Sequence, residues 1–206
     1  ETKCGLPVIG MIKESKTQRT TVVVVGGGQA GLSASHQLCK SGIKHVVLER
    51  SKRFHSWKKD RWDSFCLVTP NWQCRLPEWQ YEGDDPNGYM VKDEIVDYLE
   101  GFANSFQPPI HEGVRVTSVE RWSDGKILIN TSETGWIADF VILATGSYDL
   151  QLKPDFAKNL NPDIVQVSSK SYKNPSDIPD GTCLVIGTGQ SGVQMMEDLW
   201  LEGRKV

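Results

Sequence analysis

The chain has 206 residues, which is enough for one large domain or two small ones. Its 23 basic and 26 acidic residues leave a net charge of −3, so no nucleic-acid partner is expected, because a polyanion needs a concentrated positive field. Hydrophobic residues make up 38% and charged residues 24% of the sequence, a balance that is typical of globular chains and excludes a disordered one.

The sequence predicts neither a membrane span nor a metal site. The longest segment without Lys, Arg, Asp or Glu covers 20–39, but its glycines, glutamines and His36 would be costly in lipid. Five cysteines without a C-x-x-C pair argue against a disulfide framework, a dithiol redox centre and a tetrahedral zinc site. The four histidines have no metal-binding spacing. With no secretory signal visible, a cytoplasmic location is expected.

The first predicted elements spell β-α-β. Residues 1–19 show no sustained hydrophobic period and are interpreted as an N-terminal arm. The β-branched run 21–25 ends on three glycines, which is typical of a strand buried on both faces of a parallel sheet. A helix ending at Ser41-Gly42 and a second strand over 45–49 follow. This order predicts an α/β fold.

The remaining chain continues with an irregular region and further alternating elements. Residues 50–88 are irregular and hold four of the seven tryptophans, which is unusual for a loop. The spacing of apolar residues predicts a helix over 92–106. Beyond it the sequence predicts strands at about 113–121, 126–131 and 138–143, a connection over 150–181, a strand over 182–186 and a helix through Met195, Met196 and Leu199.

A glycine motif, the first glycine turn (residues 26–31), lies between the first strand and helix. Its G-x-G-x-x-G pattern allows a tight turn at Gly26, close approach of backbone N–H groups to a pyrophosphate at Gly28, and close helix packing at Gly31. Glu49 ends the second strand, where an acidic group would accept hydrogen bonds from an adenosine ribose. These features favour a dinucleotide site. The alternatives are a glycine turn of an unrelated α/β domain and a surface role for Glu49.

The second glycine turn (residues 187–192) repeats the strand–turn–helix context. Two such turns in one chain suggest two dinucleotides and electron transfer between them. The alternative is a repeat that binds nothing. The strand whose end would separate NADH from NADPH lies beyond Val206, so either nucleotide fits these residues.

The order of these features resembles the flavoproteins with two dinucleotide-binding domains. In that group the first turn holds FAD and the second holds a nicotinamide. The resemblance therefore implies a Rossmann-like FAD-binding domain at 20–152, followed at 153–206 by a linker and the first β-α of an incomplete NAD(P)-binding domain. A strand closing on Ala144-Thr145-Gly146 also matches this order.

Segments of the irregular region are similar to flavin-containing monooxygenases, and most similar to a bacterial-type branch of flavoproteins associated with cation diffusion facilitators. Residues 57–65 resemble the tryptophan-containing segment beside the flavin, and 67–72 the segment near its isoalloxazine ring. The resemblance covers 20–204 but only the front portion of a full-length member. The residues it implies for FAD are Gly26, Gly28, Gln29, Ala30, Gly31, Glu49, Arg50, Trp57, Trp62, Asn71, Val116, Ala144, Thr145 and Gly146. Those implied for NADPH or NADH are Gly187, Gly189, Gln190, Ser191 and Gly192.

Several of these residues also have plain structural interpretations. Trp57 and Trp62 could pack without touching a flavin, Asn71 could begin a turn after Pro70, and Val116 could serve as a β-branched core residue. The sequence therefore leaves both roles open for each of them.

One departure from the monooxygenase pattern bears on the reaction. The family fingerprint F-x-G-x-x-x-H-x-x-x-(Y/W), anchored on Tyr172, meets Pro162, Ile164 and Ser168 in place of Phe, Gly and His. This change affects the expectation of oxygen insertion more than that of FAD binding. Tyr172 itself could be plain linker packing.

Three functions remain open. The favoured one is an NAD(P)H-dependent flavin monooxygenase or related oxidoreductase, with a small-molecule substrate and molecular oxygen as partners. The second is a flavin reductase or oxidase that inserts no oxygen, favoured by Ser168. The third is a non-catalytic FAD-binding fragment. No catalytic residue and no oligomeric state are indicated.

Overall fold

The computed structural model describes residues 17–148 and 151–206, so most of the predicted arm and Cys4 lie outside the described residues. A six-stranded sheet in the order β5-β2-β1-β8-β7-β6 organises the chain. The strands are β1 (Gln18–Val25), β2 (His45–Glu49), β5 (Ile110–Glu112), β6 (Val116–Arg121), β7 (Ile127–Thr131) and β8 (Gly135–Leu143). β1 pairs in parallel with β2 and β8, and β2 with β5, whereas β7 pairs antiparallel with β6 and β8. The α/β fold is confirmed.

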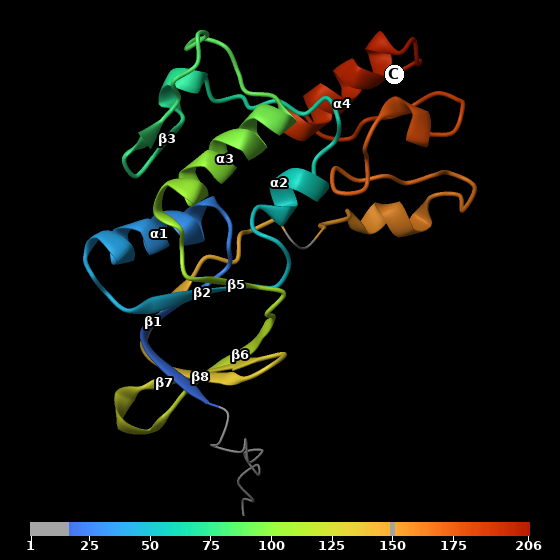
Figure 1. The fold of residues 1–206 in the computed structure, drawn as a ribbon. Helices are drawn as coiled ribbons and strands as arrows, with labels where there is room; N and C mark the ends of the chain where they lie inside the picture. The colour runs from blue at the N-terminus through green and yellow to red at the C-terminus, as the bar shows by residue number, and fades with distance from the viewer. Residues whose placement is uncertain (1–16, 149–150) are drawn as a thin grey trace, which may run out of the picture.

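The helices lie on one side of the parallel strands, and the antiparallel strands curl beneath the other (Figure 1). The helices are α1 (Gln29–Lys40), α2 (His55–Lys59), α3 (Lys92–Phe106) and α4 (Gln190–Leu201). Short 3-10 turns occur at Asn71–Gln73, Ser123–Gly125, Asp155–Asn159 and Pro175–Asp177, and a two-stranded hairpin forms from β3 (Arg75–Leu76) and β4 (Trp79–Gln80). None of the described helices combines the length and apolar character needed to cross a bilayer.

β1 is buried on both faces because its side chains alternate between two cores. Val22 and Val24 pack among the residues beneath the helices, together with Leu32 of α1 and Phe102 of α3. The opposite face of the strand packs into a second cluster, formed by Val23, Val25, Val46, Leu48, Val114, Ile129, Trp136 and Ala138. The uninterrupted valine run thus has the burial that the sequence predicts.

Helix α3 has the predicted bounds, and local chemistry explains its start. The Glu94 carboxylate accepts the Val91 N–H at 3.0 Å, and Asp93 adds a second acidic group in the first turn, where the helix dipole favours negative charge. Its apolar face buries Ile95 and Leu99.

Three boundaries differ from the prediction. β1 begins at Gln18, inside the predicted arm, because this end of the strand pairs with β8. The strand predicted over 113–121 begins only at Val116, as β6, and the separate strand β5 over 110–112 was not predicted; Gly113, with φ +83°, turns the chain between the parallel and antiparallel parts. β8 begins at Gly135 rather than at Ala138.

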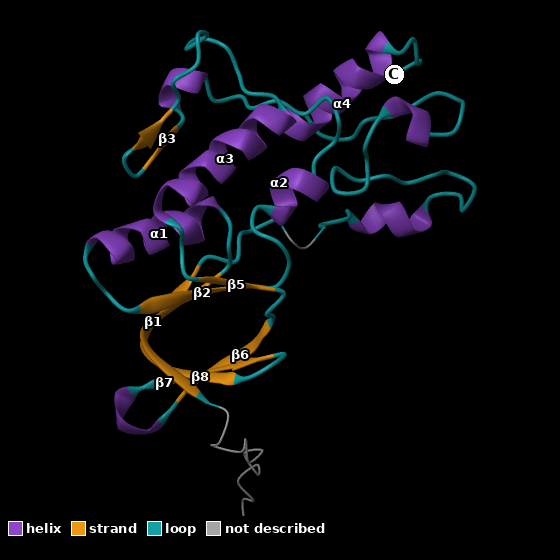
Figure 2. Cartoon of the chain, viewed as in Figure 1, coloured by secondary structure: helices purple, strands orange, loops and turns teal. Residues whose placement is uncertain are grey.

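The strand predicted over 182–186 is wrong for the described chain. Figure 2 shows this segment as loop, and no described segment pairs with it in a sheet. Leu184 and Ile186 are exposed, at 85% and 62%, whereas Cys183 and Val185 are partly buried against the core beneath the helices. A β-branched, apolar run forms a strand only where a neighbour accepts its backbone hydrogen bonds.

Candidate functional site

The first glycine turn lies at the carboxyl end of β1, against the end of β8. Gly26 has φ +112°, and a Cβ there would lie 2.3 Å from the Ala144 carbonyl oxygen. A Cβ at Gly31 would lie 1.9 Å from the Gly26 oxygen. Gly28, by contrast, faces open space, with nothing within 4 Å of a built Cβ. Two of the three glycines therefore serve packing, and Gly28 leaves room for a ligand to approach the backbone.

The helix after this turn begins without a side-chain cap. Gly28 is the N-cap of α1, no acidic residue lies in the first turn, and no described side chain caps it. The backbone N–H groups at the start of the helix, which include those of Gln29 and Ala30, have no acceptors within the helix. Such an end favours an anion through both the free donors and the helix dipole.

Glu49 lies beside this turn at the end of β2. Its carboxylate accepts the Gly27 N–H at 2.6 Å and the Ser51 N–H at 2.8 Å. These two bonds fix the carboxylate next to the glycine backbone, where the sequence places a ribose. Arg50 follows as an exposed residue at the same edge of the sheet.

The end of β8 completes this edge of the sheet. The Ala144 N–H donates to the Val25 carbonyl at 2.8 Å, which extends the β1–β8 pairing into the turn. Thr145 and Gly146 follow as exposed residues, and Gly146 has φ +75°. The predicted segment 144–146 therefore lies against the first glycine turn.

The tryptophan loop (residues 54–66) is attached to the same turn. The Phe54 N–H donates to the Gly27 carbonyl at 3.3 Å. Trp62 is 2% exposed and meets Phe65 edge to face at 4.9 Å. Trp57 is half-buried under the Arg61 guanidinium, 4.9 Å from the ring centre. Burial lowers the pKa of Arg61.

The indole nitrogen of Trp62 is buried without a hydrogen-bond partner among the described residues. A buried donor without an acceptor costs free energy, so such a group usually has a partner. The open space at Gly28 and the uncapped start of α1 fit a pyrophosphate, whereas protein atoms already cover the Trp62 indole.

Two predicted FAD residues also have structural partners. The Asn71 amide donates to the Asp85 carbonyl and accepts the Met90 N–H, both at 2.9 Å, and is 4% exposed. It thus holds two parts of the loop together. Val116 begins β6 opposite Thr131 and packs against the second core cluster.

The second glycine turn repeats the geometry of the first. Gly187 has φ +118°, and a Cβ at Gly192 would lie 2.2 Å from the Gly187 oxygen. Gly189 is the N-cap of α4 and faces open space, and α4 has neither a side-chain cap among the described residues nor an acidic residue in its first turn. The side chain of Gln190 donates to the Cys66 carbonyl at 3.1 Å, and Ser191 follows it in the first turn.

The fingerprint residues form part of the linker. Tyr172 is 2% exposed, and its hydroxyl donates to Asp198 of α4 at 2.5 Å. Burial, followed by the Asp198 carboxylate, raises the pKa of Tyr172. Ser168 accepts the Tyr172 N–H through its backbone oxygen at 2.9 Å, whereas Pro162 and Ile164 are exposed. The packing interpretation of Tyr172 is confirmed.

An open cleft of about 520 Å³ lies beside α2 and β5, in a region that the sequence analysis did not single out. Glu100 of α3 accepts hydrogen bonds there from Arg53 Nε at 2.8 Å and from Lys58 Nζ at 2.5 Å. Burial raises the pKa of Glu100, but the hydrogen bonds from Lys58 and Arg53 outweigh it and lower that pKa. These ion pairs tie the tryptophan loop to α3. No three described His, Cys, Asp or Glu side chains gather as a metal site would require.

The comparisons with known proteins agree with this geometry. The family model of the pyridine nucleotide-disulphide oxidoreductases matches residues 23–206, and the chain belongs to this family. An uncharacterized CzcO-like oxidoreductase of Geobacillus kaustophilus is 37% identical over 86% of the chain and 51% of its own length. The probable indole-3-pyruvate monooxygenase YUCCA3 of Arabidopsis thaliana is 27% identical over 88% of the chain and 44% of its own length.

Solved structures of monooxygenases are also similar to this chain. The flavin-containing monooxygenase of Stenotrophomonas maltophilia matches with a TM-score of 0.79 at 27% identity, over 89% of this chain and 56% of that one. A steroid monooxygenase solved with NADP matches with a TM-score of 0.62 at 27% identity, over 88% of this chain and 37% of that one. The chain therefore spans about half the length of the curated relatives it matches. The resemblance to flavin monooxygenases is confirmed.

Proposed function

We propose that this chain is the front part of an FAD-dependent oxidoreductase of the monooxygenase type, with FAD at the first glycine turn and NADPH or NADH at the second. The observation that carries the proposal is the repeated geometry: a glycine with φ above +110°, an uncapped N-cap glycine facing open space, and a glycine packed on the first one's oxygen. Similarity to a probable indole-3-pyruvate monooxygenase and to a solved flavin-containing monooxygenase supports it.

Each part of the first site has a distinct role in this proposal. The start of α1 binds the pyrophosphate, with Gly28 allowing close approach. Glu49 accepts from the ribose hydroxyls after exchanging or sharing its bonds to Gly27 and Ser51. Trp62 supports the loop beside the first turn through its packing on Phe65. The same edge of the sheet carries Arg50, Ala144, Thr145 and Gly146, and Trp57 lies in α2, on the loop that is bonded to the first turn.

The second site binds the nicotinamide dinucleotide at the start of α4, through Gly187, Gly189, Ser191 and Gly192. When bound, the nicotinamide supplies a hydride, and the flavin supplies hydride acceptance and oxygen activation. The protein's residues hold the two cofactors in place. The proposed domains are 20–152 for FAD and 153–206 for the linker and the first β-α of the NAD(P) unit.

A second candidate is a flavin reductase or oxidase without oxygen insertion. Ser168, which stands where the family fingerprint has a histidine, favours this candidate. The contacts of Ser168 are made within the linker turn, and its hydroxyl lies 3.2 Å from that of Ser171. Substrate-dependent consumption of NAD(P)H with an oxygenated product would favour the monooxygenase, and consumption without such a product the reductase.

The test is a visible absorption spectrum of the purified chain with FAD, before and after anaerobic NADPH or NADH. We expect a bound, two-banded flavin spectrum that bleaches with one of the nucleotides. A flavin that binds without bleaching would support the first site and contradict hydride transfer in this chain. No bound flavin would contradict the proposal.

A further inference from the structure

The carboxyl end of the tryptophan loop lies between two helices. Cys66 pairs with Val91 in an isolated antiparallel bridge at the start of α3. The bridge bonds run from the Leu67 N–H to the Met90 carbonyl at 3.0 Å and from the Lys92 N–H to the Phe65 carbonyl at 2.9 Å. In this pattern the N–H and carbonyl of Cys66 itself point away from α3.

Two glutamines of α4 bind this outward-facing backbone. The Gln194 amide donates to the Cys66 carbonyl at 3.0 Å, and its oxygen lies 3.5 Å from the Cys66 N–H. Gln190 donates to the same carbonyl at 3.1 Å. The two glutamines are four residues apart, so they lie on one face of the helix. The side chain of Gln194 thus pairs with Cys66 as a strand backbone would.

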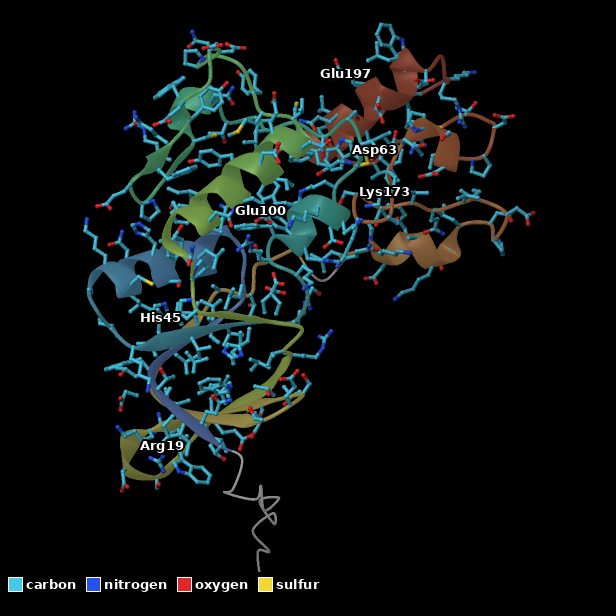
Figure 3. The ribbon with its side chains drawn as sticks, viewed as in Figure 1. Arg19, His45, Asp63, Glu100, Lys173 and Glu197 are labelled. Carbon is cyan, nitrogen blue, oxygen red and sulfur yellow. The ribbon has the colours of Figure 1, made fainter. Side chains whose placement is uncertain are left out.

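Asp63 holds the same loop to α3 and the linker. Its carboxylate accepts from Lys92 of α3 at 2.7 Å and from Asn174 of the linker at 3.0 Å, and its N–H donates to the Lys173 carbonyl at 2.8 Å. Asp63 and Lys173 lie close together between α2 and α4 (Figure 3). The segment 62–66, which carries the buried Trp62, is therefore fixed on both sides.

These contacts connect the two glycine turns. Gln190 is the first residue of α4 and part of the second glycine turn, whereas the tryptophan loop begins with the Phe54 bond to the first turn. The far end of α4 is held by the bond between Asp198 and Tyr172. Hydride transfer needs the reacting atoms within about 3–3.5 Å and aligned, so the relative position of the two turns decides the rate.

We propose that Gln194 is a positioning residue that couples the two sites: by pairing with Cys66 it sets the start of α4, and hence a bound nicotinamide, relative to the flavin side of the tryptophan loop. This inference rests on the proposed function. Nucleotide binding at α4 is then transmitted to residues 62–67, because Gln190 and Gln194 bond α4 directly to this segment. Gln190 supports the same contact from the first turn.

The test compares Gln194→Glu with Gln37→Glu in the FAD-loaded protein. The carboxylate of Gln194→Glu has the same size but cannot donate to the Cys66 carbonyl. Gln37 lies on the exposed face of α1, so Gln37→Glu makes the same charge change away from the contact. The measurements are FAD affinity, the rate of anaerobic flavin bleaching at saturating NADPH, the long-wavelength charge-transfer absorbance, and hydrogen exchange of peptide 62–67 with and without NADP⁺.

We expect Gln194→Glu to bind FAD as the wild type does but to bleach about tenfold more slowly at saturating NADPH, since a displaced nicotinamide loses alignment. It should also lose charge-transfer absorbance and the protection of peptide 62–67 that NADP⁺ confers. Gln37→Glu should match the wild type throughout. Unchanged bleaching and protection in Gln194→Glu would overturn the coupling alone. A wild type that binds no flavin would overturn the proposed function and the coupling with it.

Discussion

The two glycine turns have nearly the same local geometry but very different surroundings. Gly26 and Gly187 share a left-handed φ, at +112° and +118°, and each turn packs its last glycine on the oxygen of its first. The strand before the first turn is buried within a six-stranded sheet, whereas the segment before the second pairs with no described strand and exposes Leu184 and Ile186. The turn geometry is therefore a local property of the glycine spacing, and its rigidity depends on the sheet.

The largest expected effect comes from adding a methyl group at the last glycine of each turn. In Gly31→Ala the new Cβ would lie 1.9 Å from the Gly26 oxygen in a packed sheet edge, so we expect a loss of about 2–3 kcal/mol in the free energy of unfolding and loss of FAD binding. Gly192→Ala meets the Gly187 oxygen at 2.2 Å, but the segment before this turn pairs with no described strand, so a smaller loss of about 1 kcal/mol is expected. Urea unfolding and FAD titration measure both. Equal losses would mean that the second turn is as constrained as the first.

Substitutions at the two N-cap glycines should have the next largest effect, and they should weaken cofactor binding with little change in the stability of the fold. Gly28→Ala and Gly189→Ala place a methyl group in open space, at φ of −82° and −76°, so the free energy of unfolding should change by less than about 1 kcal/mol. FAD affinity should fall about tenfold or more in Gly28→Ala, and nucleotide affinity likewise in Gly189→Ala, because the methyl group occupies the approach to the phosphates. Flavin fluorescence and NADP⁺ titration measure these affinities. A variant that weakened both cofactors equally would contradict separate sites.

A smaller loss of FAD affinity is expected on substitution of Glu49, a residue without a counterpart beside the second glycine turn in the described chain. Glu49→Gln replaces charged acceptors for the Gly27 and Ser51 N–H groups by a neutral amide, so FAD affinity should fall about fivefold. NADP⁺ affinity should stay unchanged, which makes it the internal control. A change in NADP⁺ affinity alone would reverse the assignment of the two sites.

The smallest effect is a difference in pH dependence between the two regions. Glu100, beside the first turn, has a lowered pKa in the folded chain, so its contribution to stability is present above its ordinary pKa and is lost as the pH falls through the folded value. Tyr172, beside α4, has a raised pKa, so its contribution is present below about pH 10, the ordinary value, and is lost as the pH rises further. Thermal unfolding across pH checks both. Glu100→Gln should reduce only the acid dependence, and Tyr172→Phe only the alkaline one.

Much of the fold could be predicted because the relevant signals are local. The valine run, the helix over 92–106 and the spacing of the glycines each reflect neighbouring residues, and the structure has β1, α3 and both turns where they were expected. The short strand β5 was missed, because it pairs with β2 and the turn after it is held by bonds from Gly113 to Ser51 and from Val114 to Glu49, which are distant in sequence.

The candidate site was predictable in part. Glu49 beside the first turn follows from the β-α-β spacing, but the structural role of Asn71 depends on its bonds to Asp85 and Met90. The contacts of Cys66 with Gln190 and Gln194 join segments more than 120 residues apart, and no local pattern indicates them.

The sequence by itself determined the backbone conformation of both turns, because only glycine takes a left-handed φ without strain and only glycine leaves space for the packed oxygen. The tertiary structure decided which turn lies in a sheet, which tryptophan is buried and how the start of α4 meets the tryptophan loop. Those outcomes depend on hydrogen-bond partners and packing surfaces supplied by distant segments, and a strand or a buried indole is stable only where such partners exist.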